Sequence, residues 1–490
     1  MSTEIVDVRP GAYHDSVTLM RVGRTLADRD GVLDALTAMA TELNLDLLGQ
    51  LGFPVPAQAG PNDLVVAVRA VDQAAVDSAL EALTALLSAA SGPGAGAAEG
   101  GLGTAAPPRT TGSAATRGEA SLALVSVPGQ YAFAEAMDAL TAGLNVMVFS
   151  DNVTVAQEIR LKDEAARRGL IVMGPDCGTA VIGGAGLGFA NAVRPGPVGL
   201  VAASGTGSQQ VMCLLDAAGV GISHALGVGG RDLSAEVSGR STLQALAALD
   251  ADPATELILV VSKPPAPQVA DLIREAARRM ATPTLFALLG AERDDLTSAV
   301  EKALGALGVP VPRWPCRPVP QDPVRGLLRG LFAGGTLCDE AMLIAASALG
   351  PIRSNIPLRP DWTLGPPGHT MIDFGDDEMT RGRAHPMIDP TLRLERLAAD
   401  AADPSTGVLL LDVVLGYGAE PDPAALLAPA IEAARADREL PVVVSLCGTA
   451  ADPQDLDRQA TALHAAGAAV FASNAAAARH AVALIQGVPA

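Results

Sequence analysis

Aromatic residues are scarce in this chain. They make up 3% of its 490 residues, whereas hydrophobic residues as a whole make up 49%. The cores must therefore be built from Ala, Val and Leu packed in layers, which favours alternating strands and helices over a β-sandwich that draws on aromatic side chains. The chain also exceeds the roughly 250 to 300 residues at which a single core stops growing, so several domains are expected.

Positive charge is also in short supply. Lys and Arg number 34 against 54 Asp and Glu, which gives a formal net charge of -20. Such a chain is repelled by nucleic acids and by anionic membranes at long range, so we expect neither as a partner. A small anionic substrate must then be bound locally, by backbone N–H groups and a few Arg side chains.

Long apolar runs and paired cysteines are missing as well. No run approaches the roughly 20 residues that span a bilayer, and residues 1–10 lack the pattern of a signal peptide, so a cytoplasmic protein is expected. The five cysteines are scattered without a C-x-x-C pair, which predicts neither a metal site nor a disulfide framework. Cys177 is set apart because its Gly/Pro turn could stabilise a thiolate; the alternative is a buried small side chain.

Strand and helix patterns divide the chain into six segments. Residues 88–118 are almost wholly Ala, Gly, Pro, Ser and Thr, a composition that predicts a flexible linker. After it, β-branched runs alternate with helical periodicity, as in right-handed βαβ units on parallel sheets. The predicted segments are a small α+β domain over 1–87, the linker over 88–118, a Rossmann-like domain over 119–195, a flavodoxin-like domain over 196–310, a connecting region over 311–400 and a second flavodoxin-like domain over 401–490.

Some elements are predicted within the less regular segments. In the N-terminal domain, Val17 to Val22 is predicted as a strand and Gly31 to Leu43 as a helix. In the connecting region, helices are predicted over Val324 to Phe332 and Asp339 to Ala348.

A turn of small residues after the strand predicted at 198–202 is the leading candidate for a phosphate site. Glycines let a ligand approach the backbone, the N–H groups and dipole of the following helix favour an anion, and hydroxyls add donors. The alternative is an ordinary Gly-rich turn. The candidate residues are Ser204, Gly205, Thr206, Gly207 and Ser208.

Two further turns follow predicted strands. Asp176, Cys177 and Thr179 lie where open α/β sheets bind ligands and could orient a substrate amide or carboxylate, or Asp176 could only cap the turn. Arg231 and Asp232 follow a Gly-Gly turn and pair a planar anion clamp with a hydrogen-bond acceptor, unless Arg231 forms a surface ion pair.

A Pro-flanked loop supplies the candidate acid–base residue. His385 lies beside Arg381, Arg383, Asp389 and Arg393, a cluster suited to an anionic substrate. A neutral imidazole there could act as a general base or steady a leaving group; the alternative is packing against Pro386. We assign His385, Arg231 and Asp232 to catalysis, and Arg383 to substrate binding.

Three motifs carry a resemblance to a known family. They are Tyr13–Val17, Gly334–Glu340 and Arg383–Pro390, and with them the whole chain resembles the FdrA family. That family is a single-chain fusion of the α and β parts of succinyl-CoA synthetase and other NDP-forming acyl-CoA synthetases. Residues 121–300 are similar to the α subunit, and residues 407–490 to the domain that closes the β subunit.

The resemblance implies a fold and a site. The fold is α/β, with a Rossmann-like CoA-binding domain, two flavodoxin-like succinyl-CoA synthetase domains and a small N-terminal α+β domain. In the synthetases two helices, one from each subunit, point their N-termini at one phosphoryl group. The second helix is expected after Gly416, Tyr417 and Gly418, and a loop that resembles the CoA-binding turn is formed by Val127, Pro128 and Gly129.

The departures from the synthetases bear on activity. Residues 286–292 stand where the synthetases carry a phosphorylated histidine and contain none, and no segment resembles an ATP-grasp domain. The family resemblance then favours a carbamoyl- or acyl-phosphate-dependent transferase of the oxamate carbamoyltransferase type, in purine breakdown, with partner subunits. Two alternatives stay open: an acyl-CoA synthetase subunit that binds CoA and needs a separate ATP-grasp chain, and a scaffold or regulatory subunit without catalytic activity.

Overall fold

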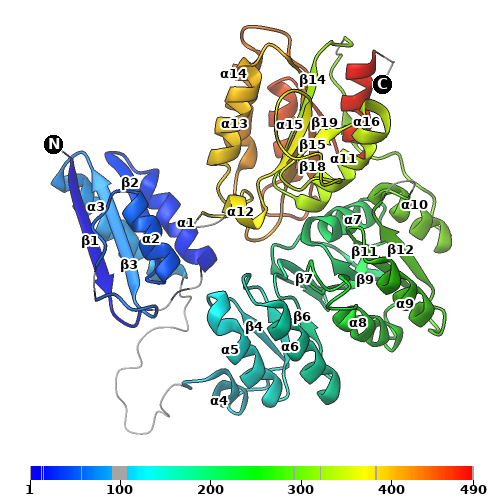
Figure 1. The fold of residues 1–490 in the computed structure, drawn as a ribbon, viewed down its shortest axis with the longest axis horizontal. Coiled ribbons are helices and arrows are strands. Elements are labelled where there is room, and N and C mark those ends of the chain that lie inside the picture. Colours follow the sequence, from blue (N-terminus) through cyan, green and yellow to red (C-terminus); the bar gives the residue numbers. More distant parts are fainter. Residues whose placement is uncertain are drawn as a thin grey trace.

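The computed structural model describes four sheets with helices packed against them (Figure 1). The described residues are 2–12, 14, 16–56, 58–90, 108–290, 293–320, 322–380 and 383–487. Most of the predicted linker, residues 91–107, lies outside them, as does part of the motif that begins at Tyr13. The far end of the linker is ordered, because α4 (Thr111–Ala115) is closed by a capping box between Thr110 and Ser113.

The N-terminal domain is an antiparallel sheet in the order β1-β3-β2 with three helices. The predicted strand at Val17 to Val22 is wrong, because Leu19, Val22 and Leu26 are buried together at helical spacing. The predicted helix at 31–43 is also wrong, since most of it pairs with β3 as a strand. The elements are β1 (Thr3–Arg9), α1 (Ser16–Ala27), β2 (Val32–Met39), α2 (Glu42–Gln50), β3 (Leu64–Ala70) and α3 (Gln73–Ala90).

A small parallel sheet in the order β4-β5-β6 forms the Rossmann-like domain. Its core is made of Ala, Val and Leu, as the scarcity of aromatic residues predicts. The elements are β4 (Leu122–Val125), α5 (Gly129–Thr141), β5 (Asn145–Val148), α6 (Val155–Arg168) and β6 (Val172–Met173).

The third sheet has six strands in the order β12-β11-β9-β10-β7-β8. Four are parallel, and the hairpin at residues 179–188 joins them antiparallel, so this hairpin belongs here and not to the preceding domain. The elements are β7 (Thr179–Ile182), β8 (Ala185–Gly188), β9 (Pro195–Ala203), α7 (Gly205–Ala217), β10 (Ile222–Gly227), α8 (Arg240–Asp250), β11 (Leu257–Ser262), α9 (Pro267–Ala277), β12 (Thr284–Leu288) and α10 (Leu296–Ala306).

The fourth sheet unites the predicted connecting region with the C-terminal domain, in the order β13-β19-β18-β17-β14-β16-β15. The predicted helix at Val324 to Phe332 is wrong, because β14 is a central strand between β16 and β17. The elements are β13 (Cys316–Arg317), β14 (Leu327–Phe332), α11 (Gly335–Leu349), β15 (Ile352–Arg353), β16 (His369–Asp373), α12 (Asp377–Thr380), α13 (Thr391–Ala402), β17 (Thr406–Val414), α14 (Pro423–Arg435), β18 (Val442–Cys447), α15 (Leu456–Ala465), β19 (Ala468–Phe471) and α16 (Asn474–Gln486).

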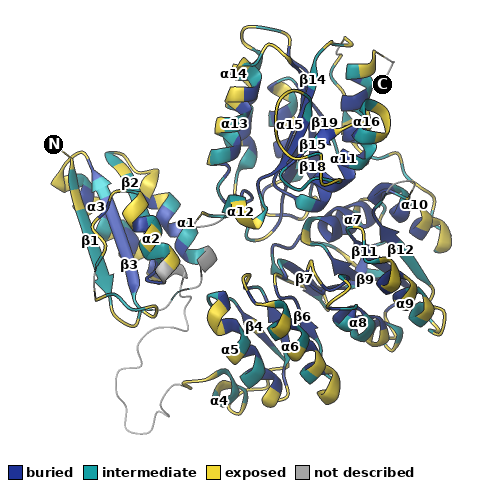
Figure 2. Ribbon diagram, in the orientation of Figure 1, coloured by how far each residue is buried: buried dark blue, intermediate teal, exposed yellow. Residues whose placement is uncertain are grey.

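One apolar core runs through the third and fourth sheets. It includes buried residues of α7 and α10 on one side and of α11 and α16 on the other, and Figure 2 shows most of α7 and α11 as buried. The side chains of Leu214 and Leu337, one from each domain, belong to this core and are almost fully buried. The relative position of α7 and α11 is therefore set by shared packing.

Candidate functional site

The N-termini of α7 and α11 meet between the third and fourth sheets. Ser204 caps α7 by accepting a hydrogen bond from Gly207 N at 2.9 Å, and its Oγ lies 2.6 Å from Thr336 Oγ1 of α11. The contact requires a small residue before α11, because a Cβ on Gly334 would lie 2.8 Å from Thr206 Oγ1. Two positive helix ends from two domains are thus held side by side.

Buried side chains fix the start of α11 but form no hydrogen bonds with the first N–H groups of the helix itself. The Asp412 carboxylate accepts hydrogen bonds from Ala333 N at 2.7 Å and Gly334 N at 2.8 Å, and it pairs with buried Arg393 at 3.1 Å. Within the described residues, no hydrogen bond engages the next N–H groups of α11 or the first two of α7. These N–H groups belong to Gly335, Thr336, Leu337, Gly205 and Thr206. Such an arrangement can bind an anion.

A cation lies beside these donors. Lys263 follows β11, and its Nζ lies 3.1 Å from the point where a Cβ on Gly335 would be. Asp339 of α11 holds this ammonium at 3.4 Å. Burial works against the charge of Lys263, but the carboxylates of Asp339 and Asp373 outweigh it and raise its pKa. Lys263 therefore stays charged at neutral pH and strengthens the preference for an anion.

The three candidate residues of the turn after β6 have different roles in the structure. Asp176 is an exposed residue, yet desolvation of its carboxyl group, together with the carboxylates of Asp377 and Asp151, raises its pKa to about 7. Cys177 is buried, and desolvation raises its pKa to about 12, so it stays a thiol rather than the thiolate that the sequence suggested. Thr179 Oγ1 donates to a backbone carbonyl at 2.7 Å inside the domain. Asp176 remains a candidate for ligand contact, while Cys177 and Thr179 are structural.

Arg231 and Asp232 are engaged in a joint between domains. Asp232 is fully buried: Oδ1 accepts from Lys162 Nζ at 2.8 Å, and Oδ2 accepts from Thr242 N and Oγ1 at 2.9 and 2.7 Å. Arg231 pairs with Glu158 of α6 at 3.0 Å, although its side chain is 46% exposed. We therefore reassign Asp232 from catalysis to structure, and Arg231 to the ion pair that was its alternative.

His385 lies near Ala333, just before the start of α11, whereas Arg383 does not contribute to this site. The His385 Nε2 lies 2.8 Å from the point where a Cβ on Gly375 would be, and its Nδ1 accepts from Met387 N at 3.2 Å. Burial lowers the pKa of His385 to about 4, so the ring is neutral at pH 7 with its proton on Nε2. Arg383 is exposed on the turn after α12, and Arg381 lies outside the described residues.

The turn expected to start the second helix packs elsewhere. Tyr417 N donates to Ala190 O at 2.8 Å, and a Cβ on Gly416 would lie 2.6 Å from the same carbonyl oxygen. Gly418 packs against Phe189 in the same way. The following helix, α14, begins only at Pro423, and the helix that meets α7 is α11. A second helix end does meet α7, but it is the start of α11 and not the helix predicted after Gly418.

The turn that resembles the CoA-binding loop has an open helix end. α5 begins at Gly129, and its N-cap residue Pro128 offers no side-chain cap. A Cβ on Gly129 would lie 2.2 Å from Asp151 O, so only glycine fits there. Val127 is tied to the next strand by Ser150 Oγ, which donates to its carbonyl at 2.5 Å. The N–H groups of this turn suit a phosphate of CoA.

Two residues of the site were missed by sequence reasoning, Lys263 and Asp373. Both stand where a strand ends, Lys263 directly after β11 and Asp373 as the last residue of β16. A polar residue at the carboxyl end of an apolar run is the pattern that could have found Lys263. β16 was hidden because its segment was interpreted as an irregular connecting region.

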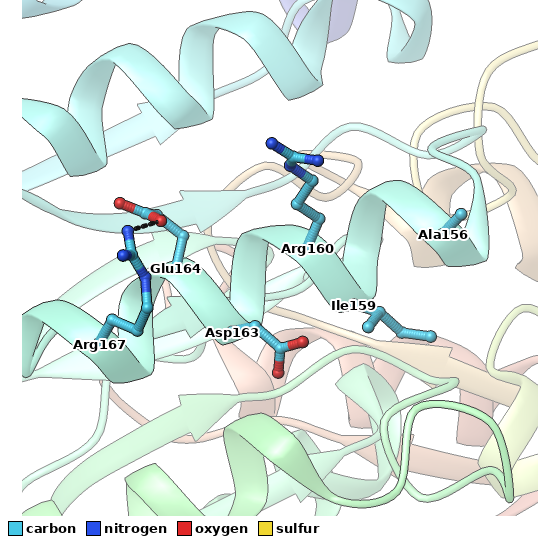
Figure 3. A pocket seen from close by; sticks show the side chains of 6 residues that line it. All are labelled: Ala156, Ile159, Arg160, Asp163, Glu164 and Arg167. Atoms are coloured by element: carbon cyan, nitrogen blue, oxygen red, sulfur yellow. Dashed lines mark hydrogen bonds and ion pairs between the residues drawn. The ribbon is translucent and has the colours of Figure 1, made fainter.

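Other features of the described chain do not mark a site. A depression on one face of α6 is lined only by residues of that helix and holds the Glu164–Arg167 pair (Figure 3). Among the described residues, no group of three or more His, Cys, Asp and Glu side chains is arranged to hold a metal ion. None of the described helices combines the length and apolar character that a membrane span requires.

Two parts of the chain match known protein families. The CoA-ligase family matches residues 331–484, which contain α11 and most of the fourth sheet. The family described as "AllF, heavy metal-associated domain" matches residues 1–101. No cysteine lies in those residues, so they offer no thiolate to a soft metal ion.

The chain is similar over nearly its full length to a bacterial relative, and over part of its length to CoA ligases. YahF of Escherichia coli K12 is 38% identical over 97% of both chains. The α subunit of malate–CoA ligase from Methylorubrum extorquens is 29% identical over 32% of this chain and 54% of its own, and the α subunit 2 of succinate–CoA ligase from Archaeoglobus fulgidus is 28% identical over 30% and 50%. The chain spans about half of these subunits. It therefore belongs to the same family as YahF, and it is an acyl-CoA ligase-like protein with a C-terminal CoA-ligase domain.

Proposed function

We propose that the protein transfers an acyl group between an acyl phosphate and the thiol of CoA. The observation that carries the proposal is the meeting of two helix ends from two domains, with open N–H groups and Lys263 beside them. The phosphate would be held by these N–H groups and by the hydroxyl of Thr206, without any need for net positive charge on the protein. The similarity to CoA-ligase subunits supports the same chemistry.

The acyl phosphate must then reach this chain from elsewhere. Residues 286–292 contain no histidine that could carry a phosphoryl group from a nucleotide. We therefore infer a partner chain that activates the acid with a nucleotide and delivers the acyl phosphate. CoA would be held at the N-terminus of α5, by the N–H groups of Gly129 and Gln130, with the exposed ring of Tyr131 available for stacking.

The comparisons favour this CoA-dependent reaction over transfer of a carbamoyl group. Several of the relatives are CoA ligases by name, among them those from Methylorubrum extorquens and Archaeoglobus fulgidus. Carbamoyl phosphate would still present the same phosphate to the two helix ends. A test of the proposal must therefore include both acyl phosphates.

Calorimetric titration of the full chain with acetyl phosphate, carbamoyl phosphate, inorganic phosphate and CoA tests the proposal. We expect binding of CoA and of at least one acyl phosphate, and formation of acyl-CoA when both are present. Thr206→Val keeps the shape of the side chain and removes a hydroxyl that would bond to a charged phosphate, worth about 1.5–3 kcal/mol. The Kd for inorganic phosphate should rise about 10- to 100-fold.

A threonine far from the site provides the control. Thr84 Oγ1 donates only to the carbonyl of Leu80 within α3, so Thr84→Val should leave the Kd for phosphate unchanged. Failure of the unmodified chain to bind any phosphate compound would overturn the proposal. Binding of acyl phosphate and CoA without formation of acyl-CoA would support the scaffold alternative, and turnover of carbamoyl phosphate without CoA would support the transferase.

A further inference from the structure

Asp373 is a buried carboxyl group with one oxygen left free at the site. It is the last residue of β16 and is 4% exposed. Its Oδ1 accepts a hydrogen bond from Gly375 N at 2.9 Å, whereas no hydrogen bond within the described residues engages Oδ2. That oxygen faces the start of α11, because a Cβ on Gly335 would lie 2.6 Å from it.

The position of this carboxyl group is well fixed. Asn355 holds the backbone of Asp373 from both sides: its Oδ1 accepts from Asp373 N at 3.0 Å, and its Nδ2 donates to Asp373 O at 2.8 Å. The following residue, Phe374, donates its N–H to Phe332 O at 2.8 Å and ties this edge to β14. The backbone of Asp373 is therefore held in place, and the hydrogen bond from Gly375 N restrains its side chain.

A neutral imidazole and an ammonium flank Asp373. The point where a Cβ on Gly375 would lie is 2.8 Å from His385 Nε2 and 3.2 Å from Asp373 Oδ1. On the other side, the corresponding point on Gly335 is 3.1 Å from Lys263 Nζ. Glycine at both positions keeps open the space around the carboxyl group, between the imidazole and the ammonium.

The charges around Asp373 place its ionisation in the neutral range. Burial raises the pKa of Asp373 to about 7, against the opposing effects of Lys263 and the Gly375 N–H. The carboxylates of Asp339 and Asp376 add to the rise. His385 remains neutral over the same range, whereas Asp373 changes its charge there, as does Asp176 on the turn after β6, whose pKa is also about 7.

A structural role alone does not explain this residue. Asp412 is also fully buried in the same domain, but both of its oxygens accept backbone hydrogen bonds and Arg393 neutralises it. Asp373 has one backbone bond, one free oxygen and no ion pair within 4.0 Å among the described residues. A buried carboxyl group left in this state points to a reacting partner.

We propose that Asp373 is the general acid–base of acyl transfer at the α7–α11 site. The inference rests on the proposed function. The carboxylate takes the proton of the thiol as sulfur attacks the carbonyl carbon of the acyl phosphate. The C–S bond forms, the bond from carbon to the phosphate oxygen breaks, and phosphate leaves with the electron pair and receives the proton from Asp373. Lys263 and the helix N–H groups hold the leaving phosphate, and His385 Nε2–H stabilises the acyl oxygen.

Asp373→Asn tests this assignment, because Asn keeps the size of the side chain and an oxygen for Gly375 N. We expect the Kd for inorganic phosphate to change less than 3-fold, while the rate of acetyl-CoA formation from acetyl phosphate and CoA falls at least 100-fold. The rate of the unmodified chain should rise with pH through an inflection near 7, as the carboxylate forms, and Asp373→Asn should lose this inflection. Asp361→Asn, an exposed carboxylate in the same domain, should change neither.

A second variant serves if Asp373→Asn does not fold. Lys263→Met removes the nearest cation, so the inflection measured at saturating substrate should move to higher pH, because the carboxylate loses a stabilising charge. Either of two results overturns the assignment. The first is an Asp373→Asn variant that keeps its rate within 5-fold of normal and keeps its inflection. The second is a Lys263→Met variant whose inflection stays in place or moves to lower pH. If the unmodified chain neither binds phosphate nor forms acetyl-CoA, the proposed function fails and this inference fails with it.

Discussion

Replacing Lys162 by Met should lower the free energy of unfolding by about 3–5 kcal/mol, the largest effect we expect on stability. The Lys162 side chain is fully buried, and its Nζ lies 2.7 Å from Glu158 Oε1 and 2.8 Å from Asp232 Oδ1. Its removal leaves the buried carboxylates of Glu158 and Asp232 without this ammonium, and among the described residues only Arg231 then pairs with Glu158. Urea unfolding followed by circular dichroism measures the change, as a lower midpoint at unchanged slope.

An exposed lysine gives the matched control. Lys302 pairs with Asp294 on the surface, with 61% of its side chain exposed, so Lys302→Met should change the free energy of unfolding by less than about 1 kcal/mol. If both variants lost the same small amount of free energy of unfolding, the buried network would not contribute to stability as we expect. That network joins α6 of the Rossmann-like domain to the turn after β10, so its loss should also loosen the joint between these domains.

The parts of the site that the sequence predicted are local in the chain. Ser204 to Ser208 were identified because a strand, a turn of small residues and a helix follow one another directly, and the hydrogen bonds of the cap lie within this stretch. The helix signal at 339–348 was likewise confirmed within α11. Where a feature depends on neighbours in sequence, propensity and turn chemistry suffice.

The missed parts depend on contacts between distant segments. Leu327 to Phe332 reads as a helix because a strand buried on both faces has no alternation of apolar and polar residues. Without that strand, the Gly334–Gly335 turn could not be assigned to the carboxyl edge of a sheet, and the second helix end was sought at Gly416. Asp373 and Lys263 come together only when two sheets from separate domains are in place. No pattern of neighbouring residues in the sequence predicts that these two side chains lie close together.

Gly335→Ala should separate activity from stability more sharply than any other single change. The added methyl group would lie 2.6 Å from Asp373 Oδ2 and 3.1 Å from Lys263 Nζ, so both side-chain ends must move. Both are ends of side chains, so they can turn aside while the backbone hydrogen bonds that hold Asp373 stay in place. Alanine is also favoured over glycine in a helix by up to about 1 kcal/mol. We therefore expect an unfolding midpoint that is unchanged or slightly raised.

The rate of acyl transfer should fall in this variant, although its stability does not. A displacement of about 1 Å in a reacting group can cost on the order of 100-fold in rate, so acetyl-CoA formation by Gly335→Ala should fall by about that factor. Gly305→Ala in α10 is the matched control, because a Cβ there meets nothing within 4 Å, and its rate should equal that of the unmodified chain. A normal rate in Gly335→Ala would mean that the space between Asp373, Lys263 and the start of α11 is not where the acyl group reacts. A loss of rate together with a loss of stability would instead show that Gly335 serves packing, since the open space would then be needed by the fold and not by a ligand.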